Sequence, residues 1–497
     1  MSTYLVDRLI KSLNSEGINY CHWKSNIDLA QATSGEMDLD FLIDRESVQP
    51  VYSILSKLGF KPAMIRRGIN TPGISHFYGY DPTADRVVHV HLFSRVLTGE
   101  SFMKSHLLPF ESMLLQNWRY DGQIRVVSKS AELVIFTIRT YIKYGSLLDL
   151  AYLWKKTEKI KAELNWIKDG SDLSEALSLL NKYCPVIEEN LFIQCINTLD
   201  NNGSLLQRIG LARKVRRRIR NYSKHTFLEW VSSFIQLVFS QVQRRIGSRK
   251  KNKVLQAGGA MIAIVGADAT GKSTLVSETG RWLGKDFLVR NIHAGKPSSS
   301  LVTAPANLIL YIIRRIMPKL RPAIKGNRSA SENGISSANT KGLVSLLFAF
   351  RAVTLAWDRR NLLSKSWRAV AKGELVISDR YPSNIIGAMD SPRLEEIEGR
   401  GWVTSVYNKA ARLEQNLYAQ IPPPDLVVSL KVSLETAKER NHLRNKLGEE
   451  TDGYIESRHQ LSSKWLRNDT ARVYEVETEQ PLPLTKLQIK SIIWHSL

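Results

Sequence analysis

The spacing of hydrophobic residues in the first quarter of the chain changes repeatedly between strand and helix periods. Residues 40–44 and 86–93 are rich in β-branched or aromatic residues, which predicts two strands. Residues 47–58 have hydrophobic positions at helical spacing and precede a glycine, which predicts a helix with a C-cap. The pattern predicts an α+β domain over residues 1–125.

After this domain the pattern predicts an all-helical segment and then an α/β domain. Residues 126–243 keep the helical period, with a helical pair expected at 131–144 and 147–156. Residues 244–259 are rich in Gly, Ser and Lys and are the expected basic linker. From residue 260 to 497 short apolar strands alternate with helices. We therefore expect a multidomain protein that ends in an α/β domain with a parallel sheet.

Length and cysteine content narrow the class of protein. A chain of 497 residues suggests two to four domains. The cysteines are Cys21, Cys184 and Cys195, and none stands at the spacing of metal ligands. This argues against a disulfide scaffold or a zinc site. The first residues do not resemble a signal peptide, and no apolar run reaches a membrane span. We expect a cytoplasmic protein.

Positive charge is concentrated in one segment, residues 213–253. This segment has thirteen Lys or Arg residues and a single acid, Glu229, so it carries +12 of the net charge of +23. Three interpretations stay open, in decreasing order of preference. They are a solvated helix that joins two domains, a peripheral contact with the inner face of an anionic membrane, and nucleic-acid phosphates. Aromatic residues are not interleaved with the charges, which disfavours single-strand recognition.

A phosphate-binding loop follows the first strand of the α/β domain. Residues 266–273 read Gly-Ala-Asp-Ala-Thr-Gly-Lys-Ser, between an apolar strand and a helical pattern. Gly266 and Gly271 allow the sharp turn that directs backbone amides at a phosphate. Lys272 adds a charge near the β- and γ-phosphates, and the Ser273 hydroxyl suits Mg²⁺. The motif predicts ATP, or a similar triphosphate, together with Mg²⁺.

A carboxylate stands about a hundred residues later, at the end of another buried strand. Residues 374–378 are apolar and are followed by Asp379, Arg380 and Tyr381. An acid at the end of a strand beside a phosphate-binding loop suits the water shell of Mg²⁺, and the arginine would then face a phosphate. The other interpretation is a surface ion pair.

Four motifs in this order resemble the thymidylate kinase family. They are residues 266–274, 357–359, 376–381, and the strand and helix that begin at 424 and 437. The resemblance implies an acceptor phosphate held by two arginines, an acid that positions the acceptor, and lid arginines that close over the transferred group. The residues expected to bind the cofactor are Gly266, Asp268, Gly271, Lys272, Ser273 and Thr274. Those expected to take part in catalysis are Lys272, Asp379, Arg380, Arg440 and Arg444. Those expected to bind the acceptor are Asp268, Arg359, Arg380 and Tyr381.

Two departures from that family matter for the acceptor. The segment after the second strand, residues 291–297, lacks the family's Arg-Glu-Pro-like sequence, and residues 300–345 form an expanded basic region. Phosphorylation of thymidine monophosphate therefore does not follow. The acceptor remains a small nucleotide or another phosphorylated or hydroxylated molecule.

Two carboxylates mark a second site in the first domain. Asp38 and Asp40 lie on the same face of a strand, where together they could chelate a cation. With the turn at 23–26, they resemble the polymerase-β type of nucleotidyltransferase, which binds Mg²⁺ through such a pair. The third acid of that family is missing, so either His91 is the ligand, Asp85 replaces it, or the domain binds without catalysis. Two solvated acids are the simpler alternative. The expected metal ligands are Ser273 and Asp379 in one site and Asp38, Asp40 and His91 in the other.

These observations favour an ATP- and Mg²⁺-dependent kinase fused to a nucleotidyltransferase-like domain. Similar bacterial chains suggest a role in surface polysaccharide assembly, by analogy of fold. Two alternatives remain. One is a kinase and nucleotidyltransferase that processes nucleic-acid ends, and the other is a non-catalytic regulator gated by nucleotide. The sequence does not indicate the oligomeric state.

Overall fold

The computed structural model divides the chain into two compact units, Met1–Gln256 and Ala257–Leu497. The residues that the structure describes are 2–66, 70–99, 104–143, 157–200, 203–224, 229, 253–295, 297–300, 303–316, 338–443, 452–463, 465 and 472–497. The helix expected at 147–156 and most of the basic segment after residue 224 lie outside them. Each unit is described by itself.

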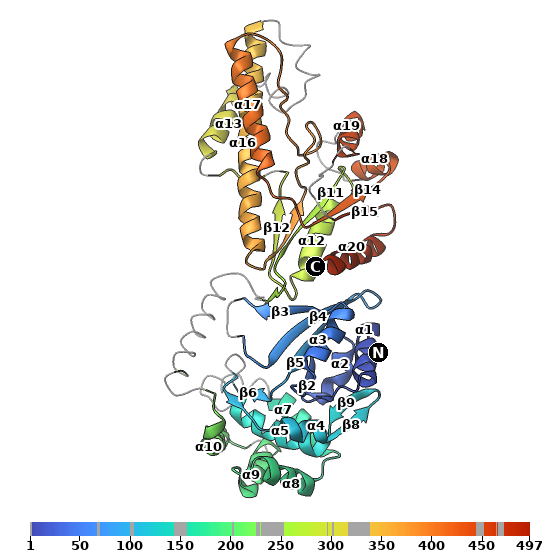
Figure 1. The fold of residues 1–497 in the computed structure, drawn as a ribbon, viewed down its shortest axis with the longest axis vertical. Coiled ribbons are helices and arrows are strands. Elements are labelled where there is room, and N and C mark those ends of the chain that lie inside the picture. Colours follow the sequence, from blue (N-terminus) through green and yellow to red (C-terminus); the bar gives the residue numbers. More distant parts are fainter. Residues whose placement is uncertain are drawn as a thin grey trace. The chain divides into compact units, whose positions relative to one another are not determined.

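Unit 1 is built on a mixed sheet of eight strands (Figure 1). The sheet order is β10-β3-β4-β5-β2-β1-β9-β8, and only the β1–β9 and β2–β5 pairs are parallel. The strands are β1 (Tyr20–His22), β2 (Leu39–Ile43), β3 (Lys61–Ile65), β4 (Ile74–Asp81), β5 (Arg86–Phe93), β8 (Trp118–Asp121), β9 (Ile124–Val127) and β10 (Lys253–Leu255). Strand β10 belongs to the stretch expected as a linker, so the end of that stretch is part of the sheet. Its residues pair with β3, which satisfies backbone groups that an edge strand would leave open.

Helices α1 and α3 pack together in unit 1 beside its sheet. The short elements of this part are α1 (Tyr4–Ser15), α2 (Leu29–Thr33), α3 (Val48–Lys57), β6 (Leu97–Thr98), β7 (His106–Leu107) and α4 (Glu111–Gln116). Helix α1 begins after Thr3, whose hydroxyl accepts a hydrogen bond from the amide of Val6 (3.3 Å). The Asp81 carboxylate accepts another from the amide of Leu5 (2.8 Å), which fixes α1 to the end of β4.

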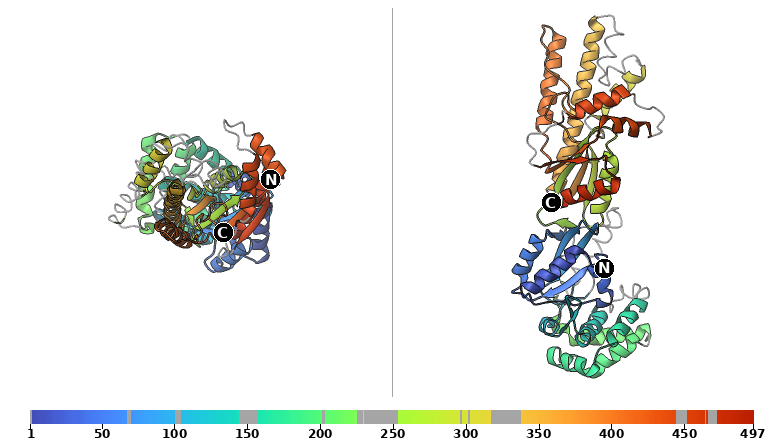
Figure 2. Two further views of the ribbon diagram at one scale, coloured as in Figure 1. Left: turned by 90° about the horizontal axis from the view of Figure 1, so that it is seen from above. Right: turned by 90° about the vertical axis from the view of Figure 1, so that its right-hand side faces the viewer.

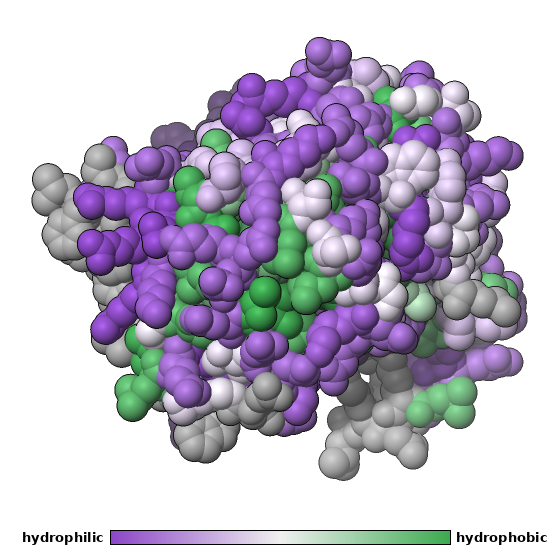
Figure 3. All heavy atoms as spheres, turned by 90° about the horizontal axis from the view of Figure 1, so that it is seen from below, coloured by the Kyte–Doolittle hydropathy of each residue, from purple (hydrophilic) through white to green (hydrophobic). Residues whose placement is uncertain are grey.

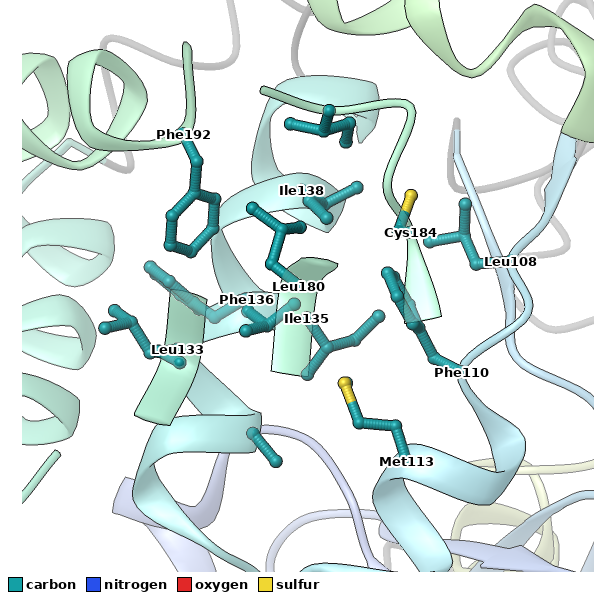
Figure 4. Packing of buried hydrophobic residues seen from close by; sticks show 14 of the residues in the cluster. Leu108, Phe110, Met113, Leu133, Ile135, Phe136, Ile138, Leu180, Cys184 and Phe192 are labelled. Carbon is teal, nitrogen blue, oxygen red and sulfur yellow. The ribbon is translucent and has the colours of Figure 1, made fainter. Parts of the chain in front are cut away.

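The rest of unit 1 is helical. Its helices are α5 (Lys129–Lys143), α7 (Thr157–Lys168), α8 (Leu173–Tyr183), α9 (Glu189–Asp200) and α10 (Leu205–Arg218). Figure 4 shows their hydrophobic core, in which Phe110 and Met113 from α4 and the segment before it meet Leu180 of α8 and Phe192 of α9. The same core includes Trp23, next to the end of β1, so the helical part continues the packing of the sheet. Burial of each such side chain stabilises the fold by about 1.5–3 kcal/mol.

The basic helix α10 uses two of its arginines inside unit 1. Arg216 donates a hydrogen bond to the carbonyl of Ile142, and Arg218 pairs with Glu188.

Figure 3 shows one face of the molecule, which is mostly hydrophilic with a smaller hydrophobic area near its middle. Within the described part of the chain, no helix combines the length and the apolar character needed to cross a membrane.

Unit 2 is an α/β domain with a five-stranded, fully parallel sheet in the order β12-β13-β11-β14-β15 (Figure 1). The strands are β11 (Ala260–Gly266), β12 (Val289–His293), β13 (Leu375–Asp379), β14 (Leu426–Lys431) and β15 (Val473–Glu477). Later strands flank the first strand on both sides, so the chain changes direction across the sheet at β11. Ligands of such sheets bind beyond the carboxyl ends of the strands at this switch point.

Helices surround this sheet, and two long ones, α16 and α17, pack against each other (Figures 1 and 2). The helices are α12 (Lys272–Leu283), α13 (Ala304–Ile316), α16 (Ala338–Val370), α17 (Trp402–Ala419), α18 (Leu434–His442), α19 (Asp452–Ser463) and α20 (Leu482–Ser496). On α16, buried Asp358 accepts hydrogen bonds from Ser300 N (2.9 Å) and Thr303 Oγ1 (2.5 Å). This ties the start of α13 to the middle of α16.

Candidate functional site

The predicted phosphate-binding loop joins β11 to α12 at the switch point of the parallel sheet. Gly266 (φ 149°) and Gly271 (φ 84°) both have backbone conformations that favour glycine. A Cβ at Gly266 would also lie 2.6 Å from the carbonyl oxygen of Leu430 on β14. Gly271 is the N-cap of α12, so the first turn of that helix opens onto the loop. A helix N-terminus in this position favours an anion.

Lys272 is held inside the loop. Its side chain is 6% exposed, and its ammonium donates to the carbonyl of Ala267. The Thr270 hydroxyl is 3.4 Å from the same ammonium, and an Asp268 oxygen is 3.9 Å away. Burial lowers the pKa of Lys272 from 10.5 to about 8. The ammonium is therefore poorly solvated, and a phosphate would give it a charged partner within hydrogen-bond distance.

Asp379 faces the start of α12 from the neighbouring strand. It ends β13, which pairs with β11 in parallel, and its Oδ2 accepts a hydrogen bond from Ser273 Oγ (3.1 Å). Its Oδ1 is buried without a hydrogen-bond partner among the described residues. A hydroxyl and a carboxylate with an unused oxygen form the oxygen donor set that Mg²⁺ takes in phosphate sites. These two residues fit the ion expected from the sequence.

Arg380 projects into a group of acids beside the loop. Its Nη2 is 2.8 Å from Asp268 Oδ1, and its Nη1 is 3.3 Å from Asp390 Oδ2. The backbone of Arg380 has φ 74°, a strained value for a residue with a side chain. A Cβ at Gly295 would lie 2.5 Å from Arg380 Cδ, so this glycine makes room for the arginine.

Arg359 is buried on α16, with a side chain 1% exposed. Its guanidinium donates to the carbonyls of Ala294 (3.0 Å), Gly295 (3.2 Å) and Asp390 (3.0 Å), to Asp390 Oδ1 (2.8 Å) and to Tyr418 Oη (2.5 Å). A guanidinium has five N–H groups, so these five bonds use all of them. Neither Asp390 nor Tyr418 was predicted from the sequence.

The other residues expected in this site lie apart from these contacts. Tyr381 is buried, and its hydroxyl donates to the carbonyl of Pro422 (2.7 Å). Arg440 donates to the carbonyl of Thr478 (2.6 Å). Thr274 is exposed on α12, and Arg444 lies outside the described residues.

A small pocket opens beside the loop, with a cavity volume of about 20 Å³, room for about one water molecule. Gly266 and Leu430 line it on the sheet side. Arg380, Asp390 and Lys431 supply its charged groups, and Trp465 supplies an aromatic wall. The pocket connects the carboxyl ends of the strands with the arginine–acid group.

Unit 1 holds its expected metal ligands in ion pairs. Asp38 Oδ1 is 2.7 Å from His89 Nδ1. Asp40 Oδ1 is 3.0 Å from His91 Nδ1 and 2.9 Å from the ammonium of Lys24. Burial would raise the pKa of Asp40, but Lys24 and His91 outweigh it and hold that pKa below its ordinary value. Burial lowers the pKa of His91 to about 4.

This arrangement does not fit the predicted metal site. Among the described residues, no three His, Cys, Asp or Glu side chains are grouped so that they could hold a metal ion. The ammonium of Lys24 already neutralises Asp40. Asp85, the alternative third acid, accepts a hydrogen bond from the hydroxyl of Tyr80 (2.8 Å) instead. Sequence spacing could not show that Lys24, sixteen positions before Asp40, would become the counter-ion of that acid.

Aromatic rings stack along β4 and β5 next to these ion pairs. Tyr78 and His89 lie nearly parallel with ring centroids 4.4 Å apart, and His76 and His91 are 4.5 Å apart. His91 also contacts the ring of Phe93 (4.3 Å). The alternation of strand residues places these side chains on one face, and only the two strands together complete the stack.

Comparison with known proteins finds a limited likeness. No family model matches the chain. It is 27% identical over 198 residues, 38% of this chain and 73% of the relative, to a protein of Escherichia coli strain K12 named uncharacterized ATP-binding protein YghR. The protein of the same name from Escherichia coli O6:H1 strain CFT073 matches equally. Thymidylate kinase from Candida albicans is similar at a TM-score of 0.27 and 19% identity, over 48% of this chain and 94% of that chain. The fold of unit 2 is therefore argued from its own strand order and loop.

Proposed function

We propose that unit 2 transfers the γ-phosphoryl group of ATP, with Mg²⁺, to a small acceptor. The observation that supports this most is the Ser273–Asp379 pair, which lies at the mouth of the loop beside a buried lysine. The relative in Escherichia coli carries the name of an ATP-binding protein, which agrees with the proposal.

In this proposal the loop amides at 266–273 and the N-terminus of α12 hold the β-phosphate. Lys272 moves its ammonium from the Ala267 carbonyl to the phosphates, which bring negative charge closer than the Asp268 oxygen at 3.9 Å. Ser273 and Asp379 would hold Mg²⁺, which would supply positive charge against the negative charge that develops on the phosphates. Arg380, at the end of the same strand, faces the transferred group.

The acceptor is a small molecule. The resemblance to thymidylate kinases favours an acceptor that carries a phosphate. The hydrogen bonds of Arg359 favour an acceptor that carries none. For unit 1 we propose ligand binding on the face of Asp38, Asp40 and His91, without metal-dependent nucleotidyl transfer. A place in surface polysaccharide assembly remains part of the proposal by analogy of fold alone.

The test is a search for the product. The full chain is incubated with ATP, Mg²⁺ and a metabolite mixture, and mass spectrometry detects a gain of one phosphoryl group. We expect a product with the wild type and with Lys285→Ala, a matched loss of an exposed lysine just after α12, and none with Lys272→Ala. Product formation at the wild-type rate in Lys272→Ala would reject the proposal. ATP binding without product from any acceptor would favour a nucleotide-gated regulator.

A further inference from the structure

We propose that Asp390 decides the acceptor class of unit 2, so that the enzyme phosphorylates a hydroxyl of a molecule that carries no phosphate. This inference rests on the proposed function and makes it more specific. It replaces the expectation that Arg359 and Arg380 bind an acceptor phosphate.

The first step is the donor count of Arg359. All five of its N–H groups already bind protein oxygens, and two of those bonds go to Asp390. The side chain is 1% exposed. A phosphate could reach it only by displacing partners that are buried with it, which would leave those partners unsatisfied. Arg359 therefore fixes the segment around Asp390 and does not bind the acceptor.

The second step is the charge around Arg380. Asp268 and Asp390 both contact its guanidinium, at 2.8 and 3.3 Å, so both of its Nη atoms already pair with carboxylates. Asp390 is shared with Arg359 and its side chain is 9% exposed. A phosphomonoester carries close to two negative charges at neutral pH, and it would have to displace one of these carboxylates to pair with Arg380.

The third step is the anchoring of Asp390. The segment after it is held by Glu414 of α17, whose Oε2 accepts hydrogen bonds from the amides of Arg393 (3.0 Å) and Leu394 (2.9 Å). Just before Asp390, the Ala388 carbonyl accepts a bond from the hydroxyl of Ser391. Glu414 is itself buried. The carboxylate of Asp390 is therefore held in place by the backbone on both sides.

The pocket beside these charges has room for about one hydroxyl group of an acceptor. It is lined by Met389, Tyr381 and Trp465 together with the Arg380–Asp390 pair and Lys431. Aromatic and thioether surfaces contact the apolar face of a small molecule, and carboxylates accept hydrogen bonds from its hydroxyls. A hydroxyl acceptor therefore gains contacts here without adding negative charge.

The experiment measures whether inorganic phosphate binds where an acceptor phosphate would bind. The full chain is first saturated with Mg²⁺ and a non-hydrolysable ATP analogue, so that the loop is filled. Phosphate is then titrated by calorimetry into the wild type, Asp390→Asn and Asp390→Ser. Glu396→Gln is the matched control, because it removes one carboxylate from an exposed pair with Arg412 in the same unit. Circular dichroism confirms that each variant is folded.

We expect the wild type and Glu396→Gln to show the same weak background of phosphate binding. The two Asp390 variants should bind phosphate about tenfold more tightly or better, since Arg380 then has one carboxylate fewer. The inference is overturned if the wild type already binds phosphate as tightly as the Asp390 variants, or if neither variant gains affinity. Failure of the ATP analogue to bind in the first titration would count against the proposed function, which separates the two failures.

Discussion

Replacement of Lys272 by methionine should make the nucleotide-free protein more stable while it abolishes ATP binding. The ammonium of Lys272 is 6% exposed, and its best partner is the neutral carbonyl of Ala267. Methionine keeps much of the length and the apolar contacts of the lysine stem without the charge. The change therefore removes the cost of burying an ammonium that waits for a phosphate.

The size of the effect follows from the pKa. Burial lowers the pKa of Lys272 from 10.5 to about 8, and each pKa unit corresponds to about 1.4 kcal/mol. The charged form therefore costs the fold up to about 3 kcal/mol. Between pH 8 and 10.5, Lys272 is protonated in the unfolded chain but loses its proton in the folded one. The free energy of unfolding of the wild type therefore rises with pH across that window. The advantage of Lys272→Met should be full below pH 8 and shrink as the pH rises toward 10.5.

Calorimetry of the full chain can follow the unfolding transition that MgATP shifts. A domain of this size gains about 2–4 °C per kcal/mol, so we expect a rise of up to about 6–12 °C in Lys272→Met at pH 7 without nucleotide. Added MgATP should raise the transition temperature of the wild type by mass action. It should leave the transition temperature of the variant unchanged, because the variant does not bind ATP. A variant that melts below the wild type at pH 7, or a difference independent of pH, would refute the reasoning.

Three other changes test separate parts of the account. Asp379→Asn should leave the fold intact but weaken MgATP binding about tenfold or more, as measured by calorimetry. Equal affinity of the wild type for ATP with and without Mg²⁺ would contradict a role of Asp379 in holding the ion. Gly295→Ala should displace the Arg380 side chain, because a Cβ would lie 2.5 Å from its Cδ, and reduce ATP turnover at least about tenfold. Gly453→Ala, where a Cβ meets nothing within 4 Å, is its control, and similar rates in both variants would be the adverse result. Asp40→Asn should lower the free energy of unfolding of unit 1 by about 3 kcal/mol or more, because the change leaves the buried ammonium of Lys24 without its counter-ion. Denaturant unfolding that shows no loss of stability would count against that ion pair.

Local patterns were enough to predict several elements of the fold. The strand expected at 86–93 is β5, Arg86–Phe93, and the helix expected at 47–58 is α3, Val48–Lys57. Both are set by the period of their own side chains. The sheet order of unit 1 was not predictable, because pairing between strands far apart in sequence depends on tertiary packing. Strand β10 shows this most clearly, since only its partner β3 makes a basic stretch into a strand.

The same limit applies to the site. The Gly-Lys-Ser motif and the acid after an apolar strand predicted Ser273 and Asp379, and parallel pairing of β11 and β13 brings them to 3.1 Å. Asp390 was not predictable, since its segment has no periodic pattern and its role depends on contacts with α16. Counter-ions such as Lys24 were missed for a similar reason. Motifs predict the groups that meet a common ligand, whereas the partners that hold those groups come from the fold.

Calorimetric titration of ATP into the full chain, with and without Mg²⁺, tests most directly whether the loop between β11 and α12 cradles a triphosphate. We predict binding of one ATP per chain that requires Mg²⁺ for full affinity and is lost in Lys272→Ala. Absence of binding in the wild type with Mg²⁺ present, or binding that survives unchanged in Lys272→Ala, would contradict the account.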